Sequence, residues 1–283
     1  GVDVNITCRS VDDHKTALRT SAGTNAGPDL YFMWAGLGLG GEFVHSGVSQ
    51  DLTKYYKQYN WASRFTKSTL SYATQYGGYN GMPWTQRTEA IYYNKALFKK
   101  AGIKTLPKTY KDLVAANDKL VKIGITPMAF GGTVNWHVMR LLDNLIETRC
   151  GAKQAAGLAA RTLSWATTPC VTLAFQDLKT WGAKYLNKSV MSVDNNAATT
   201  LFTTGRSAMQ LEGDWFTGNI VSAKLDLKNY GVFAFPTGTS RVYGFAEMIY
   251  MNSASKHQNE AAKVLDFITS NAGQTILNPA QGG

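Results

Sequence analysis

Four acidic residues beside apolar segments could act on a sugar: Glu89, Glu212, Asp214 and Glu247. Hydrolysis of a glycosidic bond needs two carboxyl groups that face each other, one as acid and one as base or nucleophile. The sequence pairs no two of these residues and marks none as buried. Glu212-Gly213-Asp214-Trp215 is more typical of a turn that presents polar groups to a ligand. We therefore predict binding without catalysis and keep a glycosidase as the alternative.

Other signatures of chemistry give no support for an enzyme. The nucleophile elbow GxSxG and the phosphate loop GxxxxGK[ST] do not occur, and we interpret the glycine-rich residues 36–41 as a flexible loop. The histidines are far apart and lack metal-ligand spacing, so each is interpreted as a lone surface residue: His14, His45, His137 and His257. We expect neither a metal nor a cofactor.

Tryptophan recurs beside turns, at Trp34, Trp84, Trp136 and Trp215. A pyranose has apolar C–H faces that aromatic rings can cover, and a rim of hydroxyls for carboxylates, amides and arginine. Polar neighbours of these kinds are Gln86, Arg87, Glu89, Asn135, Glu212, Asp214 and Glu247. Any single tryptophan could instead be a core residue. Four of them near predicted strand ends favour a ligand site, because open α/β sheets bind ligands there.

Composition limits the class of protein. The chain has 283 residues, of which 44% are hydrophobic and 17% charged, as in a globular protein of about two domains. Lys and Arg outnumber Asp and Glu by 29 to 19, but they are scattered, and the cluster in residues 95–111 follows helical spacing. This pattern is typical of a solvated helix face and predicts no nucleic-acid partner. No apolar run reaches the length of about 18 residues that spans a membrane.

The three cysteines form no CxxC pair, which excludes zinc-ribbon and thioredoxin-like patterns. Cys8 lies in a predicted first strand and is expected to be buried. Cys150 and Cys170 flank one helical segment. A disulfide between them and two unpaired buried thiols are both open interpretations.

The order of elements predicts an α/β fold. A strand at residues 1–7, a helix at 12–22 and a continuously apolar strand at 30–34 form a βαβ unit. Thr109 and Asp112 predict a capping box for a helix that ends near Gly124. Further helices are expected at residues 136–148, 171–186 and 197–202 and after a cap at Asn259, with strands at 125–130, 208–211 and 230–236. This alternation favours mainly parallel sheets.

Five segments in this order resemble the extracellular sugar-binding proteins (solute-binding protein family 1) of bacterial ABC importers, the group that includes maltose-binding protein. They are GPDLYFMW at residues 27–34, GMPW to YNK at 81–95, PKTY at 107–110, FTTGRSAM to GDW at 202–215, and YGVFAFP followed by GFA at 230–246. The family's helix-opening PKTW has Tyr110 in place of tryptophan here. Its GxW tryptophan, which usually stacks on sugar, corresponds to Trp215.

The resemblance implies two α/β lobes with crossing hinge strands and ligand in the cleft between them. Lobe one would be residues 1–86 and 246–283, and lobe two 87–245. Family members usually begin with one more strand and helix and continue with further C-terminal helices, so we expect these terminal parts to be missing from the chain. Hinge motion near residues 85–87 and 243–246 would close the cleft, with Trp34 and Trp136 on opposite walls.

The implied function is to bind a mono- or oligosaccharide and deliver it to the permease of an ABC importer, as a monomer and without catalysis. The protein would lie outside the cell, lipid-anchored or in the periplasm. A receptor for a polyamine or a metal is a weaker alternative, because it would favour carboxylates over tryptophans. The predicted ligand-binding residues are Trp34, Trp84, Arg87, Glu89, Trp136, Asp214, Trp215 and Glu247.

Overall fold

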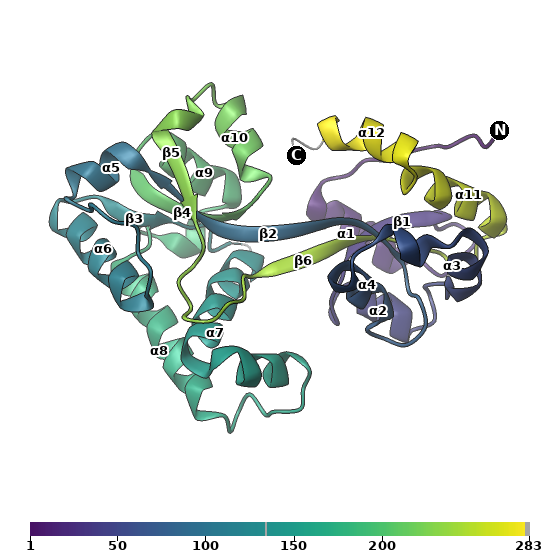
Figure 1. The fold of residues 1–283 in the computed structure, drawn as a ribbon, viewed down its shortest axis with the longest axis horizontal. Coiled ribbons are helices and arrows are strands. Elements are labelled where there is room, and N and C mark those ends of the chain that lie inside the picture. The colour runs from purple at the N-terminus through teal and green to yellow at the C-terminus, as the bar shows by residue number, and fades with distance from the viewer. Residues whose placement is uncertain (134, 281–283) are drawn as a thin grey trace. The chain divides into compact units, whose positions relative to one another are not determined.

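Strand β2 (Met82–Asn94) runs through two structural units of the chain. The computed structural model describes residues 1–133 and 135–280. Unit 1 comprises residues 1–87 and 244–283, and unit 2 comprises residues 88–243. The chain therefore passes into unit 2 within β2 and returns to unit 1 at the start of β6 (Gly244–Met251) (Figure 1).

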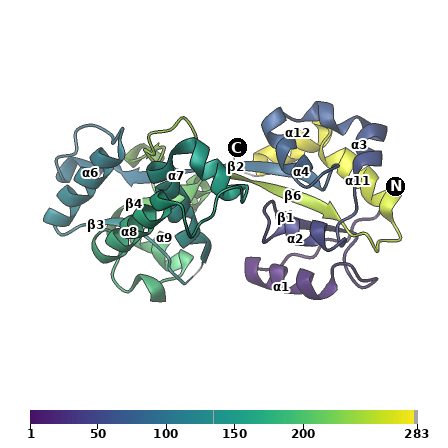
Figure 2. The same ribbon diagram turned by 90° about the horizontal axis from the view of Figure 1, so that it is seen from below.

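Unit 1 is built on an antiparallel pair of strands, β1 (Leu30–Trp34) and β6, in which Leu30 lies opposite Met251 and Trp34 opposite Glu247. Figure 2 shows α1 and α2 on one side of these strands and α3, α4 and α11 on the other. The helices of this unit are α1 (Val11–Ser21), α2 (Gly40–His45), α3 (Thr53–Tyr59), η1 (Trp61–Arg64), α4 (Lys67–Thr74), α11 (Gln258–Ile268) and α12 (Asn271–Ala280).

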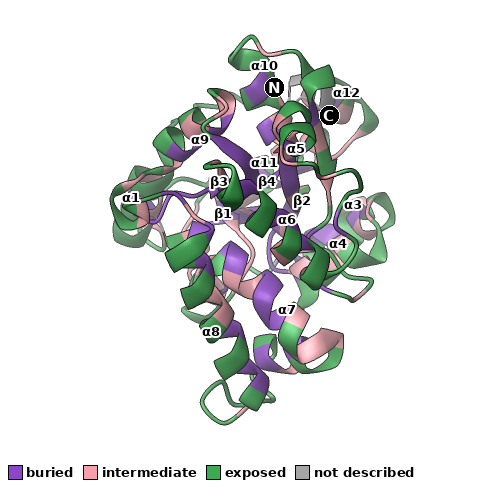
Figure 3. Ribbon diagram, turned by 90° about the vertical axis from the view of Figure 1, so that its left-hand side faces the viewer, coloured by how far each residue is buried: buried purple, intermediate pink, exposed green. Residues whose placement is uncertain are grey.

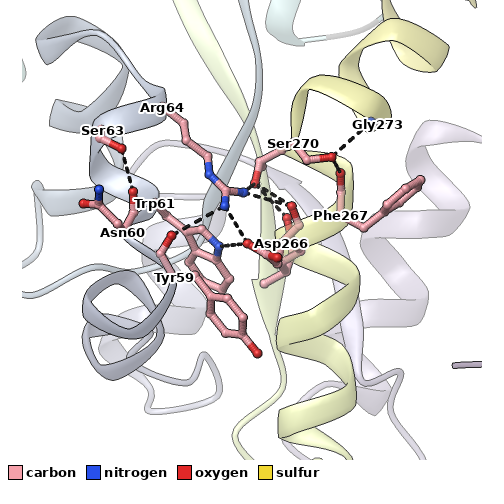
Figure 4. Close-up of polar contacts among 11 residues, drawn as sticks. Tyr59, Asn60, Trp61, Ser63, Arg64, Asp266, Phe267, Ser270 and Gly273 are labelled. Atoms are coloured by element: carbon pink, nitrogen blue, oxygen red, sulfur yellow. Dashed lines mark hydrogen bonds and ion pairs between the residues drawn. The ribbon is translucent and has the colours of Figure 1, made fainter. Parts of the chain in front are cut away.

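The two chain segments of unit 1 share one core and a polar junction. Met33 of β1, Trp61 of η1 and Leu265 of α11 belong to the same buried cluster. At its edge, Arg64 donates from Nη2 to Asp266 Oδ1 at 2.7 Å, and Trp61 Nε1 donates to the same oxygen at 3.0 Å (Figure 4). These contacts join parts of the chain about two hundred residues apart, as a domain made of two segments requires.

Unit 2 has the strand order β3-β4-β2, with β5 on the other side of β2. Its strands are the second part of β2, β3 (Thr126–Ala129), β4 (Ser207–Gly213) and β5 (Tyr230–Phe233). Its helices are α5 (Lys95–Lys100), α6 (Tyr110–Lys122), α7 (Asn135–Ala159), α8 (Pro169–Lys184), η2 (Val190–Ser192), α9 (Asn195–Thr203), α10 (Phe216–Ser222) and η3 (Leu227–Asn229).

Helices cover both faces of the unit 2 sheet. Because side chains alternate along a strand, Ile91 joins the cluster of α5, α6, α7 and α8, whereas its neighbour Tyr92 joins that of α9 and α10. β4 lies between two other strands and is buried along its whole length. Figure 3 shows the buried residues concentrated on the strands and the inner sides of the helices.

The expectation of mainly parallel sheets is wrong. β1–β6, β2–β4 and β2–β5 are antiparallel, and β3–β4 is parallel. The apolar runs that favoured parallel pairing reflect burial on both faces. Antiparallel strands have the same composition when helices cover both sides of their sheet. The α/β, two-unit character itself is present.

Two local predictions at the ends of the chain are also wrong. Residues 1–7 form no strand, because they pair with no strand in the described part of the chain. They are exposed, and so is the free thiol of Cys8. Helix α11 begins after His257, so Asn259 is not its cap. The Asn259 side chain instead accepts a hydrogen bond from the Tyr55 hydroxyl at 3.0 Å. No described helix is long and apolar enough to cross a membrane.

The prediction for the helix after Pro107 is confirmed at its start. Thr109 accepts from the Asp112 backbone N–H at 3.1 Å, and the Asp112 carboxylate accepts from the Thr109 N–H at 3.0 Å, which completes a capping box. Leu113 and Leu120 of α6 are fully buried. Local sequence was sufficient here because every partner of the cap lies within three residues.

Candidate functional site

Arg140, on the first half of α7, is the centre of a buried polar cluster in unit 2. Its Nε lies 2.6 Å from Glu89 Oε2, and its Nη1 donates to Glu212 Oε2 at 2.8 Å. Nη1 also donates to the Leu211 carbonyl at 3.1 Å. Glu89 comes from β2 and Glu212 from the neighbouring β4, so the guanidinium links α7 to two strands.

His137 lies three residues before Arg140 on α7 and is only 2% exposed. Its Nδ1 accepts from the Gly131 backbone N–H at 3.2 Å, so the proton of the neutral ring is on Nε2. Nε2 donates to Asn195 Oδ1 at 2.8 Å and lies 3.4 Å from Glu212 Oε1. The prediction of a lone surface histidine is therefore wrong for this residue, because tertiary contacts bury it.

The two carboxyl groups beside Arg140 have opposite pKa shifts. Burial raises the pKa of Glu89 to about 8, with the Arg140 charge opposing and the Glu212 charge assisting this shift. Burial also acts to raise the pKa of Glu212, but hydrogen bonds from His137 and Arg140 and the charge of Arg140 outweigh it and leave that pKa lowered. At neutral pH Glu212 is therefore the ionised partner of Arg140, and Glu89 is mostly protonated.

Two half-buried indoles lie beside the same guanidinium. Arg140 Cζ is 4.9 Å from the centroid of the Trp136 ring and 5.5 Å from that of the Trp215 ring. Both distances fall within the range of cation–π contacts. Trp136 lies in the first turn of α7, and Trp215 precedes α10. Unit 2 therefore holds two aromatic rings around one fixed cation.

Unit 1 holds a separate group of predicted residues. Arg87 Nε lies 3.3 Å from Glu247 Oε2, and the Thr85 hydroxyl donates to the same oxygen. Trp34 lies directly opposite Glu247 in the β1–β6 pair, and Lys15 Nζ is 5.2 Å from its ring centroid. Trp34, Arg87 and Glu247 are all half-buried, which leaves part of each side chain accessible.

The structure thus places six of the eight predicted residues in two groups. Glu89, Trp136 and Trp215 surround Arg140 in unit 2, and Trp34, Arg87 and Glu247 lie together in unit 1. Trp84 is half-buried in β2, and Asp214 is exposed, with its backbone N–H donating to the Thr88 carbonyl at 3.1 Å. Contact of these eight side chains with a ligand stays a prediction.

Sequence reasoning missed Arg140 and misplaced Glu212. Arg140 follows Trp136 by four residues, a spacing that puts both on one helix face, and this was the available signal. Glu212 was predicted in a turn that faces ligand, but it lies in β4 and is 1% exposed. The turn begins only after Gly213, because β4 continues its pairing with β2 to that residue.

The open question about the cysteines is answered by the structure. Cys150 of α7 and Cys170 of α8 form a disulfide, which decides between the two earlier interpretations. In residues 1–133 and 135–280, no group of three or more His, Cys, Asp or Glu side chains is arranged to hold a metal ion.

Comparison with known proteins places this fold and these residues in a family. A family model described as bacterial extracellular solute-binding protein matches residues 1–275. The chain belongs to this family of bacterial extracellular solute-binding proteins.

Individual relatives agree with this assignment. A binding protein of Brucella abortus is 31% identical over 264 residues, which cover 90% of this chain and 61% of that protein. The multiple sugar-binding protein of Streptococcus mutans is 24% identical over 283 residues, or 94% and 64% of the two chains. A solved structure of a chitin oligosaccharide binding protein superposes with a TM-score of 0.77 at 27% identity, covering 90% and 64%. The chain therefore spans about three fifths of the length of these relatives.

Proposed function

We propose that this chain binds a mono- or oligosaccharide and delivers it to an ABC importer. The observation that carries the proposal is the pair of half-buried indoles, Trp136 and Trp215, beside the buried Arg140. Aromatic faces and nearby polar groups suit the apolar faces and hydroxyl rim of a sugar. Relatives named for multiple sugars and for chitin oligosaccharide support the same ligand class.

Residues of both units take part in the proposed binding. Trp34, Arg87 and Glu247 of unit 1 would contact the sugar from one side, and Trp136, Asp214 and Trp215 of unit 2 from the other. Ligand would then favour a closed arrangement of the units through its contacts with both of them. The proposed hinges, near residues 85–87 and 243–246, lie where the chain crosses between the units.

The enzyme alternative is not supported by the carboxyl groups. Glu89 and Glu212 come from neighbouring strands, but their side chains are each 1% exposed and both contact Arg140. A glycosidase needs one carboxyl to protonate the leaving oxygen and another to reach the sugar or an activated water. Side chains that are this buried and paired with Arg140 can reach neither a leaving oxygen nor a sugar or water. Their role is therefore to stabilise the structure of the site.

The family supports a proposal for the partner and the location. A closed, sugar-loaded form would be recognised by the membrane permease of the importer. We propose that the protein acts as a monomer outside the cytoplasmic membrane, either lipid-anchored or in the periplasm. The membership of an extracellular solute-binding family supports this location.

Calorimetry tests the proposal directly. The probes are galactose, maltotriose, xylobiose and chitobiose, with spermidine as a non-sugar solute. Binding of at least one sugar with a dissociation constant in the micromolar range or tighter, with no new reducing ends released on incubation, is the expected result. Binding of spermidine alone, or release of reducing ends, would contradict the proposal.

A further inference from the structure

Arg140 is held on α7 by a set of contacts that leaves its guanidinium little freedom. Glu89 meets its Nε at 2.6 Å, while Glu212 and the Leu211 carbonyl accept from its Nη1. The residue is 5% exposed. A planar guanidinium with donors fixed in a fork keeps one orientation when several of them are engaged. Its exposure is too low for it to be a main contact for a ligand.

The fixed plane of Arg140 lies next to the rings of Trp136 and Trp215. Its central carbon is 4.9 Å and 5.5 Å from the two ring centroids. Trp136 is one helical turn before Arg140 on α7, so their side chains share a face. Trp215 lies between β4 and α10, in a different part of the chain. One buried cation therefore contacts two indoles that the backbone positions independently.

Gly213 is, after Arg140, the second residue that positions one of these rings. A Cβ added at this residue would lie 2.0 Å from Trp215 Cζ3 and 2.2 Å from its Cη2, far closer than atoms can approach. The six-membered part of the indole therefore lies directly against the Gly213 backbone. The ring is held next to the end of β4 because that residue has no side chain.

We infer that Arg140 and Gly213 are positioning residues that set Trp136 and Trp215 as two prepared faces for a sugar. Arg140 fixes both rings through its cation–π contacts, and Gly213 keeps the Trp215 ring within reach of Arg140. Rings held in place before binding lose little conformational freedom when a sugar arrives, which increases affinity. The inference rests on the proposed function for the identity of the ligand, but not for the positions of the rings.

The test uses the whole chain labelled with 5-fluorotryptophan, which gives one fluorine resonance for each of its seven tryptophans. The lines of Trp136 and Trp215 are assigned by their loss in Trp136→Phe and Trp215→Phe. Arg140→Lys, which keeps the charge but loses the fork, should shift both lines. Gly213→Ala should shift the line of Trp215 most. The other lines should stay in place.

Gly182→Ala is the matched control, because a Cβ at Gly182 of α8 meets no atom within 4 Å. It should move neither line. For the tightest-binding sugar among galactose, maltotriose, xylobiose and chitobiose, Arg140→Lys and Gly213→Ala should each weaken affinity by about tenfold or more, with Gly182→Ala at the wild-type value. If Arg140→Lys does not fold, Gly213→Ala decides the inference for Trp215.

Two results overturn the inference: the assigned lines stay in place in the folded variants, or they move while sugar affinity is unchanged. A different result overturns the proposed function, namely that wild type binds none of the four sugars. The fluorine lines of the free protein then still decide whether Arg140 and Gly213 set the two rings.

Discussion

Trp34 and Glu247 lie directly opposite each other in the antiparallel pair of β1 and β6. Directly opposed side chains project from the same face of a sheet. Glu247 is fixed on that face by Arg87 and the Thr85 hydroxyl. Two segments more than two hundred residues apart in sequence thus place an aromatic ring next to a carboxylate, and Arg87 of β2 pairs with that carboxylate. This combination is suited to a sugar.

Trp34→Ala should weaken binding of the best sugar by about 1–3 kcal/mol, because one stacking face is lost. Isothermal calorimetry measures the loss. Trp165→Ala is the matched control, since this tryptophan, 42% exposed, lies in the connection before α8 and outside both predicted groups. Equal losses in the two variants would show that the effect of Trp34 is not specific to the site.

Trp215→Ala should also cost about 1–3 kcal/mol of sugar binding, by removal of a stacking face in unit 2. We expect Trp136→Ala to fall in the same range. Because both rings contact Arg140, the double variant should lose an amount different from the sum of the two single losses. Unchanged affinity of folded Trp215→Ala would remove this residue from the proposed site.

Glu89→Gln should change how stability depends on pH. The pKa of Glu89 is about 8 in the folded protein, against an ordinary value of 4.5. Between these values the folded state binds more protons than the unfolded state, so the free energy of unfolding falls as pH rises. The slope is at most about 1.4 kcal/mol per pH unit from one group. Glutamine cannot ionise, so the variant should lose this slope.

Urea unfolding from pH 6 to 8 measures the difference. Burial also raises the pKa of Asp143, to about 6, so Asp143 contributes mainly below this range. The pKa of Glu212 lies below its usual value, so Glu212 does not titrate in this range. Glu147→Gln, at a carboxyl of unit 2 that accepts from Thr239 and pairs with Arg241, is the control for the removal of a carboxyl group. Parallel curves for wild type and Glu89→Gln would contradict a raised pKa.

Removal of the disulfide by Cys150→Ala with Cys170→Ala should destabilise unit 2 by about 3 kcal/mol, the loop-closure value for about twenty residues. The bond joins α7, which bears Arg140, to α8, so the loss should appear in the unfolding of unit 2. Cys8→Ser, at an exposed free thiol, should leave stability unchanged. A double variant as stable as wild type would show that the bond contributes little.

Sugar should also reduce the radius of gyration. The chain crosses between the units at two places, and each unit has its own buried core. Rotation about the crossings therefore need not disturb either core. Small-angle scattering with and without the best sugar measures the change. Tight binding in calorimetry with superimposable scattering curves would contradict hinge closure.

Local sequence was sufficient wherever a feature depends on neighbours in the chain. The capping box of Thr109 and Asp112 closes within one turn, and the apolar residues of α6 follow helical spacing. The family resemblance likewise depends on ordered short segments, and the match over residues 1–275 confirms it. The capping box and the helix could be predicted because the contacts that stabilise them lie at short sequence separation.

Tertiary structure alone decided the parts made by distant residues. Arg140 contacts Glu89 and Glu212, which are 51 and 72 residues away in sequence. No local pattern therefore shows that these three side chains share one buried cluster. The direction of strand pairing was misjudged for the same reason, since burial on both faces gives parallel and antiparallel strands one composition. Residue types suggested a sugar site, whereas folding determined which side chains are buried supports and which remain accessible.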